Sequence, residues 1–171
     1  MRADSGSKDR WADLYAVVAP AALGFAYGLC SGDRPAAEDL FHDAFLRCVK
    51  RRGSAEDLDG FVRYLRRAMV NASIDRSRRE STRRKWLARQ AAQGQVDDSQ
   101  VVFAERDVLL RALRHLPARQ RAAVVARTFL DLSEGDAAHV LGCSIGTVKS
   151  LTSRGLATLR LQFDQQEARD G

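Results

Sequence analysis

Small, hydroxylated and cationic side chains recur along one predicted helix near the end of the chain. The segment 132–161 predicts two helices joined by a short turn, with Ser133 capping the first helix and Gly142 ending it. The outer face of the second helix and its cap carry Ser144, Thr147, Lys149, Ser150, Ser153 and Arg154. Such a face can approach base edges and phosphates in a DNA major groove. The pattern therefore favours a helix-turn-helix, with an ordinary helical hairpin as the alternative.

A second cationic helix is predicted from Phe61 to about Trp86. Aromatic and aliphatic residues line one of its faces, and arginines with Asn71 populate the other. Guanidinium groups bind phosphates, while amide and aromatic side chains can receive unstacked bases. The pattern favours a nucleic-acid surface, although a solvated basic helix would look similar.

The charge of the chain is concentrated in its middle. The 171 residues carry a formal net charge of +6. Residues 47–89 contain 14 Lys or Arg against 5 acids, whereas residues 1–46 contain 4 against 7. A polyanionic partner is therefore expected to meet the middle of the chain.

Several classes of function find no support in the sequence. No apolar run of membrane-spanning length and no signal-peptide pattern is recognised, so a cytoplasmic protein without membrane contact is expected. Cys30, Cys48 and Cys143 lack metal-site or disulfide spacing and are predicted to be core residues. No Walker-type glycine loop and no nucleophile with its base is present, so no enzyme activity, metal or cofactor is expected.

The remaining pattern predicts an all-α chain of two small helical domains. Helices are expected over 11–30, where Pro20 should kink or interrupt the helix, and over 36–50, separated by a turn at 31–35. Residues 51–60 are expected to form a loop. The predicted domains are 10–88 and 105–162, joined by a flexible polar linker at 89–104.

Three motifs together resemble a known family. AEDLFHDAFLR at 37–47, RxxVNxxIDxxRR at 67–79 and LPARQRAAVVARTFLDLSEGDAAHVLGCSIGTVKS at 116–150 are similar to regions 2 and 4 of extracytoplasmic-function sigma factors, of the sigma-70 family. The resemblance implies a dissociable subunit of bacterial RNA polymerase. Such a subunit brings the core enzyme to promoter DNA and opens the duplex.

The resemblance also implies roles for individual residues. The residues implied to bind the minus-10 element, some through a flipped-out base and others through phosphates, are Arg51, Arg52, Arg63, Arg67, Asn71, Asp75, Arg76, Arg78 and Arg79. The residues implied to bind the minus-35 element are the six of the predicted recognition helix and its cap, with Arg119 and Arg121 on phosphates. The residues implied to dock on the polymerase are Asp39, Leu40, His42, Asp43 and Phe45.

The implied partners are core RNA polymerase, through its beta-prime clamp helices and beta flap, promoter DNA and an anti-sigma factor. Leu151 stands where many members have a polar residue, and it is expected to pack in the core. Gly135 and Gly155 are expected to loosen their helices. The alternative function is a stand-alone helix-turn-helix regulator, which would explain the C-terminal motif but not the pattern at 67–79.

Overall fold

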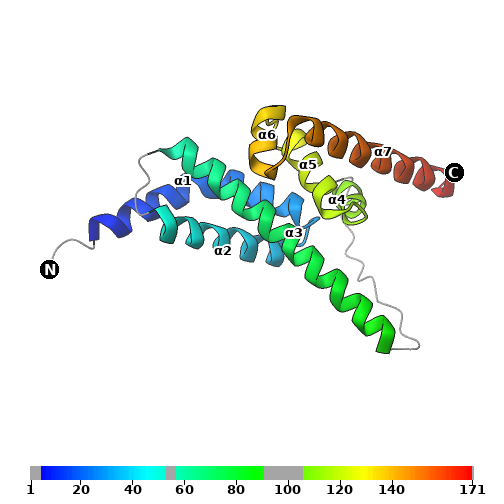
Figure 1. Cartoon of the computed structure of the whole chain (residues 1–171), viewed down its shortest axis with the longest axis horizontal. Coiled ribbons are helices and arrows are strands. Elements are labelled where there is room, and N and C mark those ends of the chain that lie inside the picture. The colour runs from blue at the N-terminus through cyan, green and yellow to red at the C-terminus, as the bar shows by residue number, and fades with distance from the viewer. Residues whose placement is uncertain (1–4, 53–56, 91–105, 171) are drawn as a thin grey trace.

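Seven α-helices make up the part of the chain that the computed structural model describes, residues 5–52, 57–90 and 106–170 (Figure 1). The N-terminal half contains α1 (Ser5–Leu29), α2 (Arg34–Arg52) and α3 (Leu58–Gln90). The C-terminal half contains α4 (Arg106–Arg114), α5 (Ala118–Thr128), α6 (Glu134–Leu141) and α7 (Ile145–Asp170). The prediction of an all-α fold is confirmed.

Two aspartates set the starts of α2 and α3. The Asp33 carboxylate accepts the backbone N–H of Ala36 at 3.0 Å, and the Asp57 carboxylate accepts that of Gly60 at 2.9 Å. Both helices therefore begin earlier than expected. The predicted loop at 51–60 is also too long, because α2 includes residues 51–52 and α3 begins at residue 58. Residues 53–56 and most of the predicted linker lie outside the described residues.

Pro20 does not interrupt the first helix, contrary to one of the two alternatives expected for it. Helix α1 runs through Pro20 from Ser5 to Leu29. Its neighbours Val18, Ala19 and Ala22 are buried, so packing on both sides of the proline offsets the missing backbone hydrogen bond.

The segment Arg10–Leu29 of α1 is also long and apolar enough to cross a membrane, contrary to the sequence-based expectation. Its mean hydropathy is 1.4, and 44% of it is buried inside the structure. Phe25 and Ala26 of this segment are almost fully buried in the core. A core helix of a soluble protein passes the same test, so the segment is weak support for a membrane span.

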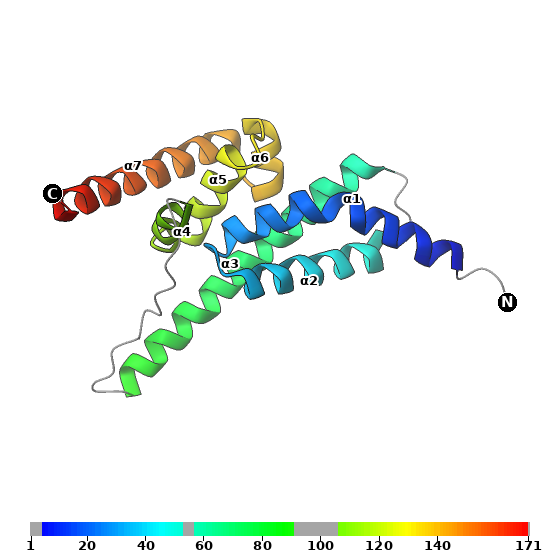
Figure 2. The same cartoon turned by 180° about the vertical axis from the view of Figure 1, so that it is seen from behind.

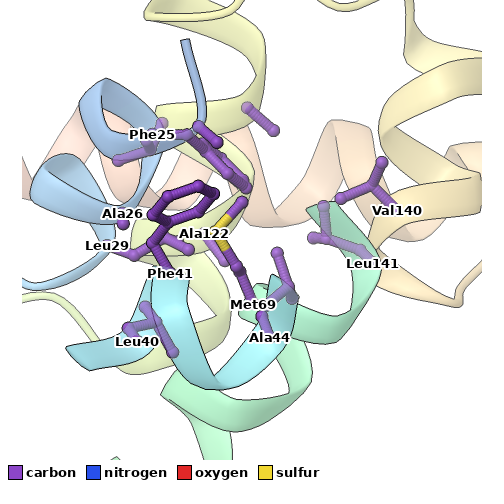
Figure 3. Packing of buried hydrophobic residues seen from close by; sticks show 14 of the residues in the cluster. Phe25, Ala26, Leu29, Leu40, Phe41, Ala44, Met69, Ala122, Val140 and Leu141 are labelled. Carbon is purple, nitrogen blue, oxygen red and sulfur yellow. The ribbon is translucent and has the colours of Figure 1, made fainter. Parts of the chain in front are cut away.

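One hydrophobic core is shared by the two halves of the chain (Figure 3). Phe25 from α1, Phe41 from α2 and Met69 from α3 belong to the same buried cluster as Ala122 from α5 and Leu141 from α6. Helix α3 contacts α6, and α1 contacts α5, so the halves lie side by side (Figure 2). We call this the packed arrangement.

Glycines at the helix crossings allow close approach of the backbones. A Cβ atom on Gly28 would lie 2.8 Å from Val125 Cγ1, across the contact between α1 and α5. A Cβ atom on Gly155 would lie 2.6 Å from Val124 Cγ2, between α7 and α5. The expectation that Gly155 loosens its helix misses this role, because the absent side chain is what lets α7 pack on α5.

Candidate nucleic-acid interface

Helices α6 and α7 form the predicted helix-turn-helix. Ser133 Oγ accepts the backbone N–H of Asp136 at 3.0 Å, which caps α6. The Asp136 carboxylate accepts the Ser133 hydroxyl at 2.6 Å and does not reach back to the backbone, as a capping box would. Gly142 ends α6 in the left-handed conformation, with φ 63°.

The cap of α7 involves two of the predicted DNA-binding residues. Ser144 Oγ accepts the backbone N–H of Thr147 at 3.2 Å, and the two hydroxyl oxygens lie 2.9 Å apart. Val148 is buried beneath this turn, and Leu151 packs against the core as expected. The outer side is free of core contacts: all six predicted residues of α7 and its cap are exposed.

Lys149 is held on this face by a partner from α6. Its Nζ lies 3.2 Å from Glu134 Oε2; the side chain of Lys149 is largely accessible to water and that of Glu134 is partly accessible. The ion pair fixes the lysine beside the turn while leaving it able to exchange partners.

Helix α3 presents a second polar stripe. Arg63, Arg67, Asn71 and Asp75 follow one another at intervals of four residues and are all exposed, as are Arg78 and Arg79. The Arg78 guanidinium lies 3.9 Å from the Asp75 carboxylate. These residues can offer both phosphate-binding and amide groups along one side of α3. Arg51 is exposed at the end of α2, and the side chain of Arg52 lies outside the described part of the chain.

Arg76 and Arg121 are separated from these two faces. Arg76 Nε donates to Glu80 Oε1 at 3.0 Å, which raises the pKa of Arg76. Both arginines line a cavity between the halves, where burial lowers the pKa of Arg121. Arg119 is exposed in the first turn of α5 and does not line this cavity.

The packed arrangement brings the two predicted DNA faces into contact at Arg67. A Cβ atom on Gly142, in the turn of the helix-turn-helix, would lie 3.3 Å from Arg67 Nη2. Arg67 and Ser144 line the same cavity of about 490 Å³. The neighbouring Arg66 is half-buried, and its desolvation lowers its pKa while the nearby Asp136 charge raises it.

Helix α2 offers part of the predicted docking set to solvent. Asp39, His42 and Asp43 are exposed, but Leu40 and Phe45 are each only 7% exposed and belong to the core. Leu40 and Phe45 therefore lie beneath the exposed face that carries Asp39, His42 and Asp43. Leu46 is 54% exposed beside His42 and Asp43, three or four positions along the helix, and the sequence reasoning missed it.

Contacts and burial determine the properties of two further side chains, Tyr15 and Cys30. Tyr15 Oη and His42 Nε2 lie 2.7 Å apart, so α1 orients the exposed histidine on α2. Burial raises the pKa of the Cys30 thiol to about 11, so this cysteine stays protonated at neutral pH and is a poor nucleophile.

Comparison with known families identifies both halves. The model described as "Sigma-70 region 2" matches residues 14–83, and the model described as "Sigma-70, region 4" matches residues 106–159. The region 2 match covers the helices that a stand-alone helix-turn-helix regulator would not explain, so that alternative is not supported.

Individual relatives agree with these matches. The chain is 36% identical to an RNA polymerase sigma-E factor of Streptomyces avermitilis over 139 residues, which covers 77% of this chain and 73% of the relative. It is 26% identical to the ECF RNA polymerase sigma factor SigW of Bacillus subtilis over 171 residues, covering 92% and 91% of the two chains.

A solved structure shares the fold. The sigma factor RpoE of Bartonella quintana, solved in complex with the anti-sigma factor NepR, superposes with a TM-score of 0.66 at 25% identity, covering 88% of this chain and 94% of that one. The chain therefore belongs to the sigma-70 family and is an RNA polymerase sigma factor of the extracytoplasmic-function type.

Proposed function

We propose that α7 reads the minus-35 element of a promoter and that α3 captures the non-template strand of the minus-10 element. The observation that supports this division most directly is the presence of two separate polar faces in one chain. The face on α7 carries Lys149, Ser150 and Arg154, and the stripe on α3 carries Arg67 and Asn71.

The two faces suit different forms of DNA. A helix with small and cationic residues in its first turns fits the major groove of duplex DNA. Melting requires that unstacked bases be held outside the duplex, at a cost of a few kcal/mol that their binding must offset. The arginines of α3 can bind phosphates while Asn71 offers an amide to a base edge. The chain supplies binding energy for opening and acts without catalytic chemistry or a cofactor.

The chain acts mounted on core RNA polymerase. We propose that Asp39, His42 and Asp43, with Leu46, contact the beta-prime clamp helices, and that the C-terminal half contacts the beta flap. An apolar side chain among exposed polar ones is the composition expected of a small docking surface. The site of action is the cytoplasm.

Promoter binding requires the packed arrangement to open. The two promoter elements lie about 25 base pairs apart, as their names state, or about 85 Å at 3.4 Å per base pair. Arg67 and Gly142 are in contact in the structure, so the two faces cannot reach both elements at once. The halves must therefore separate when core polymerase and promoter are bound.

An anti-sigma factor is the further partner proposed for this chain. The related sigma factor RpoE was solved in complex with the anti-sigma factor NepR. We propose that a protein of this kind binds here and covers the docking face of α2. Purification of the chain from native cells with polymerase subunits as its sole partners would count against such an inhibitor.

Transcription with purified components tests the function. Core polymerase with this chain should initiate at a defined promoter class in a randomised library, where core polymerase alone does not. Initiation at the same positions with and without the chain would refute the proposal.

Substitutions test the division of roles. Arg67→Ala and Asn71→Ala should spare binding of the holoenzyme to minus-35 duplex and reduce permanganate reactivity of the minus-10 region. Lys149→Ala and Arg154→Ala should each weaken duplex binding by about 1–3 kcal/mol if the replaced side chain reads a base. Arg34→Ala is the matched control, since Arg34 is exposed at the start of α2 and pairs with Glu38. If both pairs of substitutions reduced opening of the minus-10 region equally, the division of roles between α3 and α7 would be contradicted.

A further inference from the structure

A cavity of about 630 Å³ lies where the two halves of the chain meet. Its walls come from the turn between α1 and α2, from the middle of α3 and from the turn between α4 and α5. Figure 2 shows α4 beside the turn that joins α1 to α2. We call this space the junction cavity. Its size is within the range of pockets that hold small molecules.

The lining of the junction cavity is rich in arginine. Arg76 and Arg84 come from α3, and Arg114 and Arg121 come from the C-terminal half. The acids of the lining are Asp33 and Glu80, so four arginines face two carboxylates. Both carboxylates are also engaged locally, since Asp33 caps α2 and Glu80 binds Arg76 at 3.0 Å. Bringing the halves together therefore concentrates positive charge between them.

Arg121 is the most desolvated of these cations. Burial lowers its pKa, and its Nη1 donates to the Leu113 carbonyl oxygen at 3.4 Å. Within residues 5–52, 57–90 and 106–170, no carboxylate forms an ion pair with it. A guanidinium has five N–H donors, so most of the donors of Arg121 remain available to an anion.

A buried hydroxyl without a partner gives an independent indication of a ligand. Ser31 is 3% exposed and lines the junction cavity, and its Oγ has no hydrogen-bond partner in the described structure. Buried polar atoms are nearly always bonded, because a group that leaves water without gaining another hydrogen bond destabilises the fold. Pro117, which also lines the cavity, leaves the start of α5 without a side-chain cap. Anions are favoured at such a helix start.

We propose that the junction cavity binds a small molecule carrying two or more linked phosphate groups. Two linked phosphates can bind the arginines of α3 and those of the C-terminal half at the same time, whereas an isolated phosphate has fewer acceptor oxygens to share between the two walls. The bound molecule holds the halves in the packed arrangement. It thereby opposes the separation that promoter binding requires, and this consequence, though not the binding itself, rests on the proposed function.

Titration calorimetry of the full chain with inorganic pyrophosphate and tripolyphosphate tests the site. We expect one molecule to bind per chain, and Arg121→Gln and Arg84→Gln each to weaken binding at least tenfold. These two residues come from opposite walls, and Arg84 is exposed, so its replacement is tolerated by the fold even if that of Arg121 is not. Arg119→Gln is the matched control. It removes the same charge from α5 outside the cavity and should change the affinity less than twofold.

Three other results of these titrations would contradict the proposal. Equal weakening by Arg119→Gln would mean that pyrophosphate binds the general positive field of the chain. Binding of orthophosphate as tight as that of tripolyphosphate would refute the requirement for linked phosphates. A short promoter duplex that displaces pyrophosphate and loses affinity equally in Arg121→Gln would assign these arginines to DNA.

A second measurement tests the effect on the packed arrangement. Saturating tripolyphosphate should not increase the radius of gyration of the free chain. It should also slow promoter-complex formation with core polymerase. Arg84→Gln should remove that slowing. Calorimetry requires no polymerase, so absent binding would refute the site and leave the proposed function standing. A chain that binds pyrophosphate but directs no transcription would refute the proposed function and leave the site standing.

Discussion

Lys149 shows how a DNA-reading side chain is held before DNA is bound. The ion pair with Glu134 joins the two helices of the helix-turn-helix across the turn, at 3.2 Å. Because water reaches both groups, the pair contributes less than about 1 kcal/mol to stability. Its main consequence is electrostatic, since Glu134 competes with DNA phosphates for the lysine.

Replacing Glu134 by Gln should therefore strengthen binding of the holoenzyme to minus-35 duplex several-fold, with little change in the midpoint of urea unfolding. Fluorescence anisotropy at two salt concentrations measures the effect. Glu38→Gln is the control, because Glu38 forms a similar exposed pair with Arg34 on α2. Weaker binding by Glu134→Gln would mean that the carboxylate instead positions Lys149 for its DNA contact.

Cys30 should make stability depend on alkaline pH. Its pKa rises on folding from 9.0 to about 11 through burial, so the unfolded chain loses this proton first as pH increases. The contribution of the protonated thiol to the free energy of unfolding is complete below about pH 9 and is lost between about pH 9 and 11. Its size is about 1–2 kcal/mol, after discounting for the water that reaches the half-buried thiol.

Urea unfolding of the unmodified chain and of Cys30→Ala at pH 8.5 and 10.5 measures this difference. The unmodified chain should lose more stability over this interval than Cys30→Ala does. Cys143→Ala controls for the loss of a thiol elsewhere in the chain. Parallel pH profiles for the unmodified chain and Cys30→Ala would show that the thiol makes no such contribution.

At the scale of the helices, the sequence was most informative where the signal is local. Helix α6 begins after Ser133 and ends before Gly142 as predicted, because capping depends on residues within one turn. The expected break at Pro20 and the expected extent of the loop at 51–60 were wrong for different reasons. Packing on both sides holds α1 together through Pro20. Asp57, taken as a loop residue, is instead an N-cap.

Gly155 tests how closely two helices must approach. A methyl group there would lie 2.6 Å from Val124 Cγ2 and 3.5 Å from the Gln120 carbonyl oxygen. Overpacking of this kind costs about 1–3 kcal/mol. Gly155→Ala should lower the urea midpoint, although alanine favours helix by about 0.5–1 kcal/mol.

The matched control for this substitution is Gly24→Ala in α1. Gly24 also lies inside a helix, and no atom lies within 4 Å of a Cβ placed on it. It should therefore show the helix-propensity gain alone and raise the midpoint. Equal shifts for the two variants would refute the proposed close contact.

At the scale of the whole molecule, the arrangement of the halves was beyond local sequence signals. The sequence indicated both polar faces but not that Arg67 meets Gly142, because that contact joins segments far apart in the chain. Gly28 and Gly32 also lie against residues that are far away in the sequence. Their importance becomes visible only once Val125 and Leu110 lie against them.

Gly28 offers a way to separate the halves without touching either DNA face. A methyl group at this position would lie 2.8 Å from Val125 Cγ1, within the contact between α1 and α5. Gly28→Ala should therefore disfavour the packed arrangement. In small-angle scattering the free chain should show a larger radius of gyration, and with core polymerase it should form promoter complexes faster. Gly24→Ala, on the same helix without a neighbour, should change neither. A Gly28→Ala chain with a larger radius of gyration that forms promoter complexes at the original rate would show that opening of this contact does not limit promoter binding.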